Sequence, residues 1–265
     1  MSQIHPTAII HHNAKIGENC NIGPYCTVGE QVTLHNNVTL ISSVVVDGDT
    51  TIGEGTIIYP FATIGLKSQD LKYRNEPTKV VIGKNTTIRE HVTIHLATSE
   101  GICTKVGDNC LLMVGCHVAH DCIIGNDVII SNSVLLGGHV QIGNSVTIGG
   151  NSAIHQHVHL GEYAFIGGYS AVVADIVPFA IYTGIRDGEI NGANLVGLKR
   201  KGFANIDIQN IVQAYKILFA KDSLFKDNIN TLQSTFPNHE LVNKIINFVS
   251  REGSRNICTN YKSNK

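Results

Sequence analysis

The chain has 265 residues and a mass of 28.6 kDa, enough for one large domain or one domain with an appendage. Lysine and arginine number 20 against 21 aspartate and glutamate, so the chain has no overall basic charge for nucleic acid. Only 15% of residues are charged, 43% are apolar and tryptophan is absent, which excludes a disordered chain and predicts an aliphatic core. Because no segment resembles a signal peptide or approaches ~18 uninterrupted apolar residues, we expect a soluble cytoplasmic protein without an integral membrane segment.

A six-residue repeat runs from Ile4 to Val172. Of the 29 positions in this phase, 26 are Ile, Leu or Val, and the exceptions are Asp70, Glu76 and Glu100. The residue two positions earlier is small or β-branched, so two side chains of each hexad point inward. Three hexads make one triangular coil, and coils stacked ~4.8 Å apart predict a mainly β chain that forms a hexapeptide parallel β-helix, shaped as a triangular prism.

Glycine often follows the large aliphatic residue, and we attribute it to corners that need the conformational freedom of glycine. The period leaves the hand of the coil open, since parallel crossovers are normally right-handed. Five of the seven cysteines occupy the small inward column, where a thiol packs as a compact apolar group: Cys20, Cys26, Cys110, Cys116 and Cys122. An odd count without a C-x-x-C motif suits a reducing compartment.

Two segments interrupt the repeat. Residues 66–80 keep the register at both ends but carry polar residues in the core phase, so we expect an ejected loop. Residues 96–104 form a shorter interruption. Long loops on a rigid scaffold are usually functional, although a disordered excursion is the alternative.

After Val172 the pattern ends in a linker-like stretch, and helical spacing follows it. We divide the chain into a β-helix over residues 1–190 and a small C-terminal α-helical domain over 191–265. Apolar stripes predict helices around Ile208–Phe219, Leu224–Leu232 and Leu241–Val249, with Asn238 as a possible cap of the last. Residues 252–265 look frayed.

Histidine is frequent, with 13 residues, and six of them fall between 117 and 159. Three hexads along the sequence lead to the same edge of the next coil. His120 then aligns with Gly138 and Gln156, and Asp121 aligns with His139 and His157. These two adjacent columns predict a polar site on one outer edge of the prism.

The chemistry of these columns suggests acyl transfer. Asp121 could hold the His120 imidazole while its other nitrogen acts as a base, although adjacent side chains need not meet. The N–H of Gly138 could stabilise an oxyanion. With no strong nucleophile nearby, this combination favours direct acyl transfer to a hydroxyl. The alternative is zinc held by His117, His120 and His139, with a neighbouring subunit contributing.

Six stretches carry a resemblance to a known family: GLKSQDLKY (65–73), IREHVTIHLAT (88–98), CHVAHDC (116–122), LGGHV (136–140), AIHQ (153–156) and GLKRKGF (197–203). Over nearly the whole chain the sequence resembles the UDP-N-acetylglucosamine acyltransferases, which start lipid A synthesis in Gram-negative bacteria. The resemblance implies a left-handed coil and a homotrimer with active sites between subunits. It also implies transfer of an (R)-3-hydroxyacyl chain from acyl carrier protein to the 3-hydroxyl of UDP-N-acetylglucosamine, without cofactor or metal.

The resemblance also implies residue roles. His120 matches the general base, Asp121 its supporting carboxylate and Gly138 the oxyanion donor. Further substrate contacts match Asp70, Lys72, His117, His139, His155 and Gln156, with Lys72 acting at the adjacent subunit's site. Asn194, Arg200 and Lys201 match a uridine- and phosphate-binding segment, and Arg200 is the better phosphate partner because its fork can bind in a bidentate way. Lys199, Arg200 and Lys201 could instead contact acidic carrier protein or form a solvated helix start.

Some positions depart from the family pattern. The family usually has Arg-Arg where Arg200 and Lys201 stand and an acidic residue where Val196 stands, and residues 185–193 do not align cleanly. Gly168 matches a position that closes the acyl groove when bulky, so we expect a preference for a longer chain. Two other functions stay open: the N-acyltransferase of the same pathway, which usually has an extra N-terminal domain, and a non-catalytic scaffold.

Overall fold

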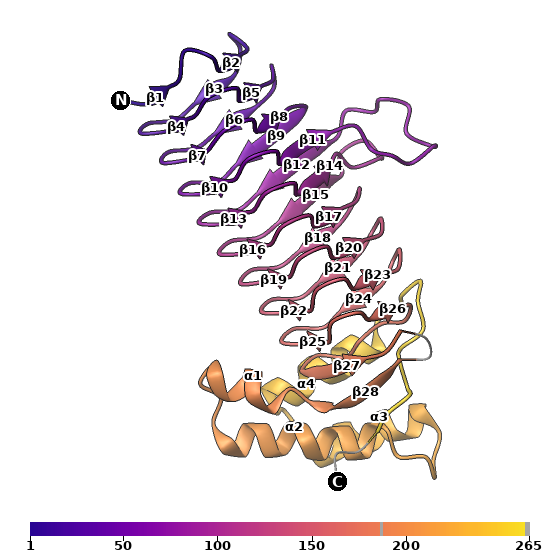
Figure 1. The fold of residues 1–265 in the computed structure, drawn as a ribbon. Helices are drawn as coiled ribbons and strands as arrows, with labels where there is room; N and C mark the ends of the chain where they lie inside the picture. The colour runs from indigo at the N-terminus through magenta and orange to yellow at the C-terminus, as the bar shows by residue number, and fades with distance from the viewer. Residues whose placement is uncertain (186–187, 263–265) are drawn as a thin grey trace.

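The computed structural model describes residues 1–185 and 188–262. Figure 1 shows a long stack of coils that begins at the N-terminus and ends against a helical C-terminal region. Within the described residues the coils form three parallel sheets, here called sheets A, B and C, one for each face of the prism.

Apart from β27 and β28 at the end of sheet A, neighbouring strands of each sheet are three strands apart in the chain. Sheet A has 11 strands: β1 Gln3–Ile4, β4 Asn21–Ile22, β7 Thr39–Leu40, β10 Ile57–Ile58, β13 Thr87–Ile88, β16 Leu111–Leu112, β19 Ile129–Ile130, β22 Thr147–Ile148, β25 Phe165–Ile166, β27 Ala180–Thr183 and β28 Glu189–Ala193. Sheet B has nine: β2 Ile9–Ile10, β5 Thr27–Val28, β8 Val45–Val46, β11 Thr63–Leu66, β14 Thr93–His95, β17 His117–Val118, β20 Leu135–Leu136, β23 Ala153–Ile154 and β26 Ala171–Val172. Sheet C has eight: β3 Lys15–Ile16, β6 Thr33–Leu34, β9 Asp49–Ile52, β12 Lys79–Ile82, β15 Cys103–Val106, β18 Ile123–Ile124, β21 Gln141–Ile142 and β24 His159–Leu160.

The strand register preserves the inward aliphatic column. Val106 pairs with Ile124 in the next coil, which is the predicted step of three hexads. The step is longer where the repeat is interrupted, because Ile52 pairs with Ile82, five hexads on, and Ile82 pairs with Val106, four hexads on. Both interruptions therefore leave the prism between a strand of sheet B and the following strand of sheet C, and the coils close again in register.

The core is a continuous column of aliphatic side chains, as the repeat predicts. The five cysteines of the small inward column are buried within it, and all seven cysteines are free. Burial raises the pKa of the Cys110 and Cys116 thiols to about 11 and that of Cys122 to about 12. These thiols are un-ionised at neutral pH and act in packing.

The corners of the coils correct our explanation of the repeated glycines. Of the glycines that follow the large aliphatic, only Gly65 has a positive φ. Their role is instead to let coils approach: a Cβ on Gly149 would lie 2.4 Å from the Gly168 nitrogen of the next coil. The left-handed turn falls two residues later, at positions such as Asp121, His139 and His157, with φ of 61°, 60° and 66°. Asn, Asp and His tolerate this conformation better than most side chains.

The C-terminal region closes one end of the prism (Figure 1). β28 pairs antiparallel with β27 and crosses the boundary that we expected at residue 190. Four helices follow in the described chain: α1 Leu195–Arg200, α2 Asn205–Leu218, α3 Phe225–Thr235 and α4 Glu240–Ser250. The expected cap Asn238 is wrong, because the N-cap of α4 is His239, whose ring accepts from the Val242 N–H. No helix in the described residues is long and apolar enough to cross a bilayer.

The expectation of a frayed C-terminus is wrong for residues 252–262. Asp175 and Ile257 form a parallel bridge, and so do Ile190 and Tyr261. This segment, the C-terminal strap, therefore runs back beside the last coils, where Figure 1 shows it near β26. Residues 263–265 of our expectation lie outside the described part.

Candidate active site

The predicted polar columns lie along the corner between sheets B and C, which we call the site edge. Residues 119–121, 137–139 and 155–157 occupy it in three successive coils. The His139 N–H donates to the His120 carbonyl at 3.0 Å, and the His157 N–H donates to the Gly138 carbonyl at 3.0 Å. The step of three hexads is therefore correct for both columns.

His120 and Asp121 form a direct pair, which sequence reasoning had left open. The Nδ1 atom of His120 lies 2.7 Å from Oδ2 of Asp121, and the two residues are 8% and 6% exposed. Thr98 donates to the same carboxylate from its N–H at 3.0 Å and from its hydroxyl at 2.6 Å. Burial alone would raise the Asp121 pKa, but the hydrogen bonds from His120 and Thr98 prevail and lower it to about 2. An ionised carboxylate accepts only, so His120 carries its proton on Nδ1 and leaves Nε2 as an acceptor.

The ejected loop returns to this pair. It spans residues 67–78 between β11 and β12, close to the expected 66–80. Its Asp70 places Oδ2 3.6 Å from Nε2 of His120, while Oδ1 accepts from the Lys72 N–H at 2.8 Å. Lys72 itself is exposed. The loop thus brings a second carboxylate close to Nε2 of the His120 imidazole and leaves Lys72 facing solvent.

Gly138 supplies a bare peptide beneath the His120 ring. A Cβ at this position would lie 2.3 Å from Cε1 and 2.4 Å from Nε2 of His120, so any side chain would displace the imidazole. At the corner between sheets C and A, the N–H at the same hexad position bonds to the side chain of the next coil, as when Asp108 N–H donates to Asn126. Within the described residues the Gly138 N–H has no hydrogen-bond partner.

Further histidines surround the pair. His139 stacks on His157, with ring centroids 4.5 Å apart, and meets His120 edge-on at 5.1 Å. Burial, together with the charges of His139 and Arg255, lowers the pKa of His157. These rings form a continuous imidazole surface along the site edge.

His117 lies one strand before the pair. Its Nδ1 is 2.7 Å from the Thr93 hydroxyl, and its ring meets that of His95 edge-on. Burial, with the neighbouring His95 and His120, lowers the pKa of His117 to about 4. Burial likewise lowers the pKa of His95. At neutral pH His117 is therefore an uncharged hydrogen-bonding group.

Several other predicted residues lie off the site edge. Gly168 is exposed at the corner between sheets A and B. Asn194 caps α1, accepting from the Gly197 N–H at 3.0 Å and donating to the Tyr163 carbonyl at 3.0 Å. Arg200 and Lys201 are exposed at the end of α1, in the helical region of Figure 1. One chain alone does not bring these residues to His120.

Sequence reasoning missed four residues at or beside the site: Thr98, Thr104, His95 and Arg255. Thr98 and Thr104 bond to Asp121, and Arg255 bonds to the Gln156 carbonyl at 2.9 Å and to the His155 ring at 2.6 Å. Thr98 is not a whole number of coils away from Asp121, so the step of three hexads could not find it. The strap that carries Arg255 shows no repeat at all.

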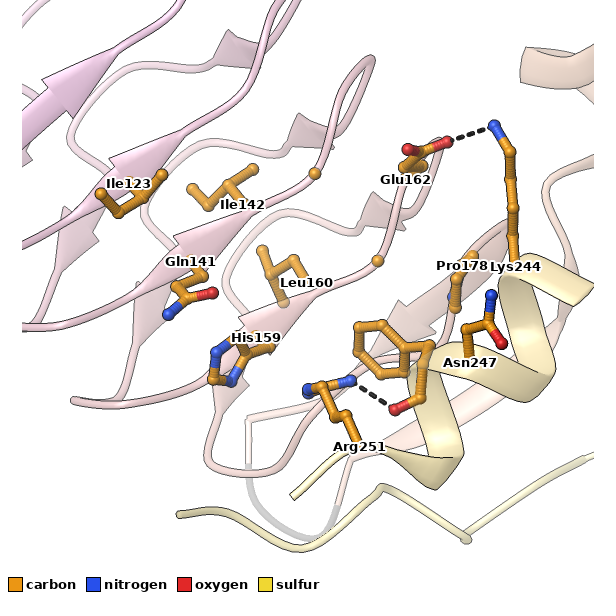
Figure 2. A pocket seen from close by; sticks show the side chains of 13 residues that line it. Ile123, Gln141, Ile142, His159, Leu160, Glu162, Pro178, Lys244, Asn247 and Arg251 are labelled. Carbon is orange, nitrogen blue, oxygen red and sulfur yellow. Dashed lines mark hydrogen bonds and ion pairs between the residues drawn. The ribbon is translucent and has the colours of Figure 1, made fainter. Parts of the chain in front are cut away.

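A separate pocket of about 400 Å³ lies between sheet C and α4 (Figure 2). Ile123, Ile142 and Leu160 form part of its wall. The charged groups at its rim are already engaged, since Glu162 accepts from Lys244 at 2.8 Å and Arg251 donates to the Phe248 carbonyl at 2.6 Å. None of our predicted site residues lines it, so this pocket is separate from the site edge.

The residues that could hold a metal ion differ from the three histidines that we considered as zinc ligands. The ligand atoms of His120, Asp121 and His139 all lie within 4.8 Å of one another. His117, which we had included, is not in this group and bonds to Thr93 instead. The three residues can therefore serve either as a hydrogen-bonded acid–base group or as imidazole and carboxylate ligands.

The hexad-built coils place the chain among the hexapeptide-repeat proteins, and the family model that these repeats match is one of transferases. Residues 103–138 match the family model described as bacterial transferase hexapeptide (six repeats), and residues 4–98 match the model of the GMPPB C-terminal domain. Residues 175–258 match the model described as Udp N-acetylglucosamine O-acyltransferase, domain 2.

Relatives narrow this class to one family. The chain is 45% identical over 97% of both chains to the acyl-[acyl-carrier-protein]–UDP-N-acetylglucosamine O-acyltransferase of Rickettsia canadensis, and 52% identical over 82% of both chains to that of Rickettsia typhi. A crystal structure of a UDP-N-acetylglucosamine acyltransferase aligns with a TM-score of 0.94 at 38% identity, covering 99% of this chain and 100% of that one. The Arabidopsis enzyme aligns with a TM-score of 0.86 at 34% identity, covering 97% and 100%.

The chain therefore belongs to the UDP-N-acetylglucosamine O-acyltransferases and is an acyltransferase of that family. The match confirms the predicted fold class, a left-handed parallel β-helix with a small helical C-terminal region.

Proposed function

We propose that this protein moves an (R)-3-hydroxyacyl chain from acyl carrier protein to the 3-hydroxyl of UDP-N-acetylglucosamine, the first step of lipid A biosynthesis. The observation that carries the proposal is the His120–Asp121 pair, 2.7 Å apart, beside a Gly138 N–H that has no partner among the described residues. A base and an oxyanion donor side by side suit direct transfer to a hydroxyl.

The reaction follows from the tautomer of His120. Its Nε2 atom takes the proton of the sugar hydroxyl as that oxygen attacks the thioester carbonyl. A C–O bond forms, and the Gly138 N–H stabilises the oxyanion. When the C–S bond breaks, the imidazolium returns the proton to the leaving thiolate. Asp121 stays ionised throughout, because its pKa is about 2, and it stabilises the transient positive charge.

Substrate contacts follow the site edge. Asp70 lies 3.6 Å from Nε2 of His120, close to where the reacting hydroxyl would sit, and we assign it to the sugar. His117, His139, His155 and Gln156 extend the polar surface on either side. Lys72 is exposed on its own chain and suits a neighbouring site.

The nucleotide is assigned to the α1 segment. Arg200 and Lys201 offer two exposed cations for the diphosphate, with Arg200 as the bidentate partner. The side-chain oxygen and nitrogen of Asn194 are both bonded within the chain, so it acts first by holding α1 in place, and a uridine contact would add to that role. Val196 is 59% exposed and offers no hydrogen bond at the position where the family usually has an acidic residue.

We propose a homotrimer with active sites between subunits. Gly168 and Arg200 belong to the same predicted site as His120, yet they lie elsewhere on one chain, so a neighbouring copy must supply them. The outward residues of sheet B are uncharged along its whole length, which suits a subunit interface: Ile9, Thr27, Val45, Thr63, Thr93, His117, Leu135, Ala153 and Ala171. Leu135 is 52% exposed in the single chain. Sedimentation equilibrium tests this, and a monomer at assay concentration would refute it.

The acyl groove and the compartment complete the proposal. A side chain at Gly168 would meet nothing nearer than the Gly150 carbonyl oxygen, at 3.3 Å, so the groove stays open to a longer chain. A cytoplasmic location is supported by seven free cysteines, five of them in the apolar core, where oxidation would disrupt packing.

The decisive experiment incubates the protein with UDP-N-acetylglucosamine and a series of hydroxyacyl carrier proteins, followed by mass analysis of the sugar nucleotide. We expect an ester at the 3-position, and loss of turnover without unfolding in His120→Ala. Acylation of an amino sugar instead would indicate the N-acyltransferase of the pathway. Turnover abolished by chelators and restored by zinc would refute the metal-free mechanism, and no product with any donor would refute the function.

A further inference from the structure

The C-terminal strap is fixed at both ends to the last coils. Asp175 is the centre of this attachment: its carboxylate accepts from Arg251 at 2.5 Å and from the His159 N–H at 2.8 Å. Its backbone accepts from the Cys258 N–H at 2.8 Å and donates to the Asn256 carbonyl at 2.9 Å. The residues between these anchors, 252–255, are therefore held in a fixed place beside the site edge.

Arg255 is the residue that the strap brings to the site edge. Its Nε donates to the Gln156 carbonyl at 2.9 Å, and its terminal nitrogen lies 2.6 Å from Nδ1 of His155. The guanidinium thus spans two consecutive residues that are 99 and 100 positions earlier in the chain. Both belong to the coil after Gly138, at the corner that the proposed substrate faces.

The chemistry of the guanidinium determines which nitrogen of His155 carries the proton. Arginine has donors only, so Nδ1 of His155 must accept. The imidazole proton then lies on Nε2, which points a donor away from the strap. The contact of 3.3 Å between this Nδ1 and the Gln156 carbonyl joins two acceptors, and both take their hydrogens from Arg255.

We propose that Arg255 is a positioning residue, which fixes His155 as an Nε2–H donor and orders the peptide of Gln156 for the nucleotide-sugar substrate. This inference rests on the proposed function, since it takes His155 and Gln156 as substrate contacts. The Nε2–H of His155 would donate a hydrogen bond to an oxygen atom of the nucleotide sugar. A donor fixed in this way favours a phosphate, hydroxyl or carbonyl oxygen. The role would couple the C-terminal strap to substrate binding and leave the His120 pair unchanged.

The test compares Arg255→Ala and Arg255→Lys with Lys262→Ala. Lys262 is a cation of the same strap that pairs with Glu189 at 3.4 Å and touches none of the site residues, so its loss controls for strap charge. Nitrogen NMR of histidine-labelled protein, with His155 assigned by His155→Gln, reports the tautomer directly. Steady-state kinetics report KM and kcat for UDP-N-acetylglucosamine.

We expect an unprotonated Nδ1 on His155 in the native chain and in Lys262→Ala, and a mixture of tautomers in Arg255→Ala. KM for the nucleotide sugar should rise roughly tenfold in Arg255→Ala, the size of one good hydrogen bond, with kcat changed much less. Arg255→Lys should recover the loss only in part, because an ammonium lacks the fork that reaches both acceptors.

Two outcomes would overturn the proposal. One is an unchanged His155 tautomer in Arg255→Ala, and the other is a changed tautomer with an unchanged KM. If the native protein acylates no UDP-N-acetylglucosamine, the proposed function fails, while the tautomer measurement still decides whether Arg255 orients His155.

Discussion

Replacing Gly138 by alanine is the sharpest perturbation that the site offers. The added methyl would lie 2.3 Å from Cε1 and 2.4 Å from Nε2 of His120, where ordinary contacts begin near 3.4 Å. The imidazole must therefore retreat by about 1 Å, while Gly138 has no positive φ that would make alanine a strained residue. The change acts on the position of the His120 ring, the base of our proposal, and we expect it to leave the coil intact.

The expected loss of activity is large compared with the loss of stability. A displacement of about 1 Å at a reacting group costs roughly 100-fold in rate, or about 2.7 kcal/mol. The methyl also crowds the approach to the Gly138 N–H, the oxyanion donor of our proposal, which adds to the effect. We expect kcat to fall at least 100-fold, with a melting temperature close to that of the native protein.

Gly150→Ala provides a matched control. Gly150 occupies the same position of its hexad, but its nearest neighbour is the Asn132 carbonyl at 3.2 Å and no imidazole faces it. Initial rates of ester formation, with thermal melts of all three proteins, make the comparison. A folded Gly138→Ala protein with native kcat would refute the reasoning, and so would an equal loss of rate in both variants.

Three further outcomes follow from the same geometry. Thr98→Val removes the 2.6 Å hydroxyl contact to Asp121 but keeps the backbone donor, so kcat should fall about tenfold with KM nearly constant; an unchanged kcat would contradict a supporting role. His117 has a pKa of about 4 in the folded chain against 6.5 as its ordinary value, so its contribution to stability is complete above pH 6.5 and is lost as pH falls toward 4. Chemical denaturation at pH 7 and pH 4.5 should show a smaller decline for His117→Gln, by about 1–2 kcal/mol after allowance for solvent screening, and equal declines would refute it. Gly168→Met should shift donor preference to shorter acyl chains in a competition assay, whereas a native profile would show that this corner does not line the groove.

The sequence alone predicts the fold and the two polar columns because both depend on the same step of three hexads per coil. From Val106 to Leu160 each strand of sheet C pairs with the strand three hexads on, so the alignment of His120 with Gly138 and Gln156 follows from addition. The same regularity made the six-residue period visible over 26 aliphatic positions. The left hand of the coil was predicted from the family resemblance, because the six-residue period does not determine the hand.

The remaining parts of the site lie where that regularity ends. The ejected loop lengthens one coil by two hexads, since Asp49 pairs with Lys79, five hexads on instead of three. The approach of Asp70 to His120 depends on how this loop folds, and no count of residues gives it. Arg255 is still harder to foresee, because the strap is fixed by tertiary pairing with Asp175 and not by a pattern of its own.

The explanation of the repeated glycines was wrong for a physical reason that also explains the site. Because the coils are only one strand apart, a Cβ at the glycines that follow the large aliphatic, such as Gly149, would meet the backbone of the next coil. The left-handed turn is moved to a position that tolerates Asn, Asp and His, which is the column of Asp121, His139 and His157. Polar and ionisable side chains thus gather at corners without any cost to the aliphatic core.

This arrangement explains why the His120–Asp121 pair can be both buried and polar. Both extra loops leave at the site edge, so Thr98 and Asp70 cover Asp121 and His120 from one side while the coil supports them from below. The carboxylate is held by three donors and stays ionised despite its burial, which keeps the His120 proton on Nδ1. Gly138 has two roles. Its missing side chain makes room for the His120 ring, and it leaves the peptide N–H beside that ring accessible.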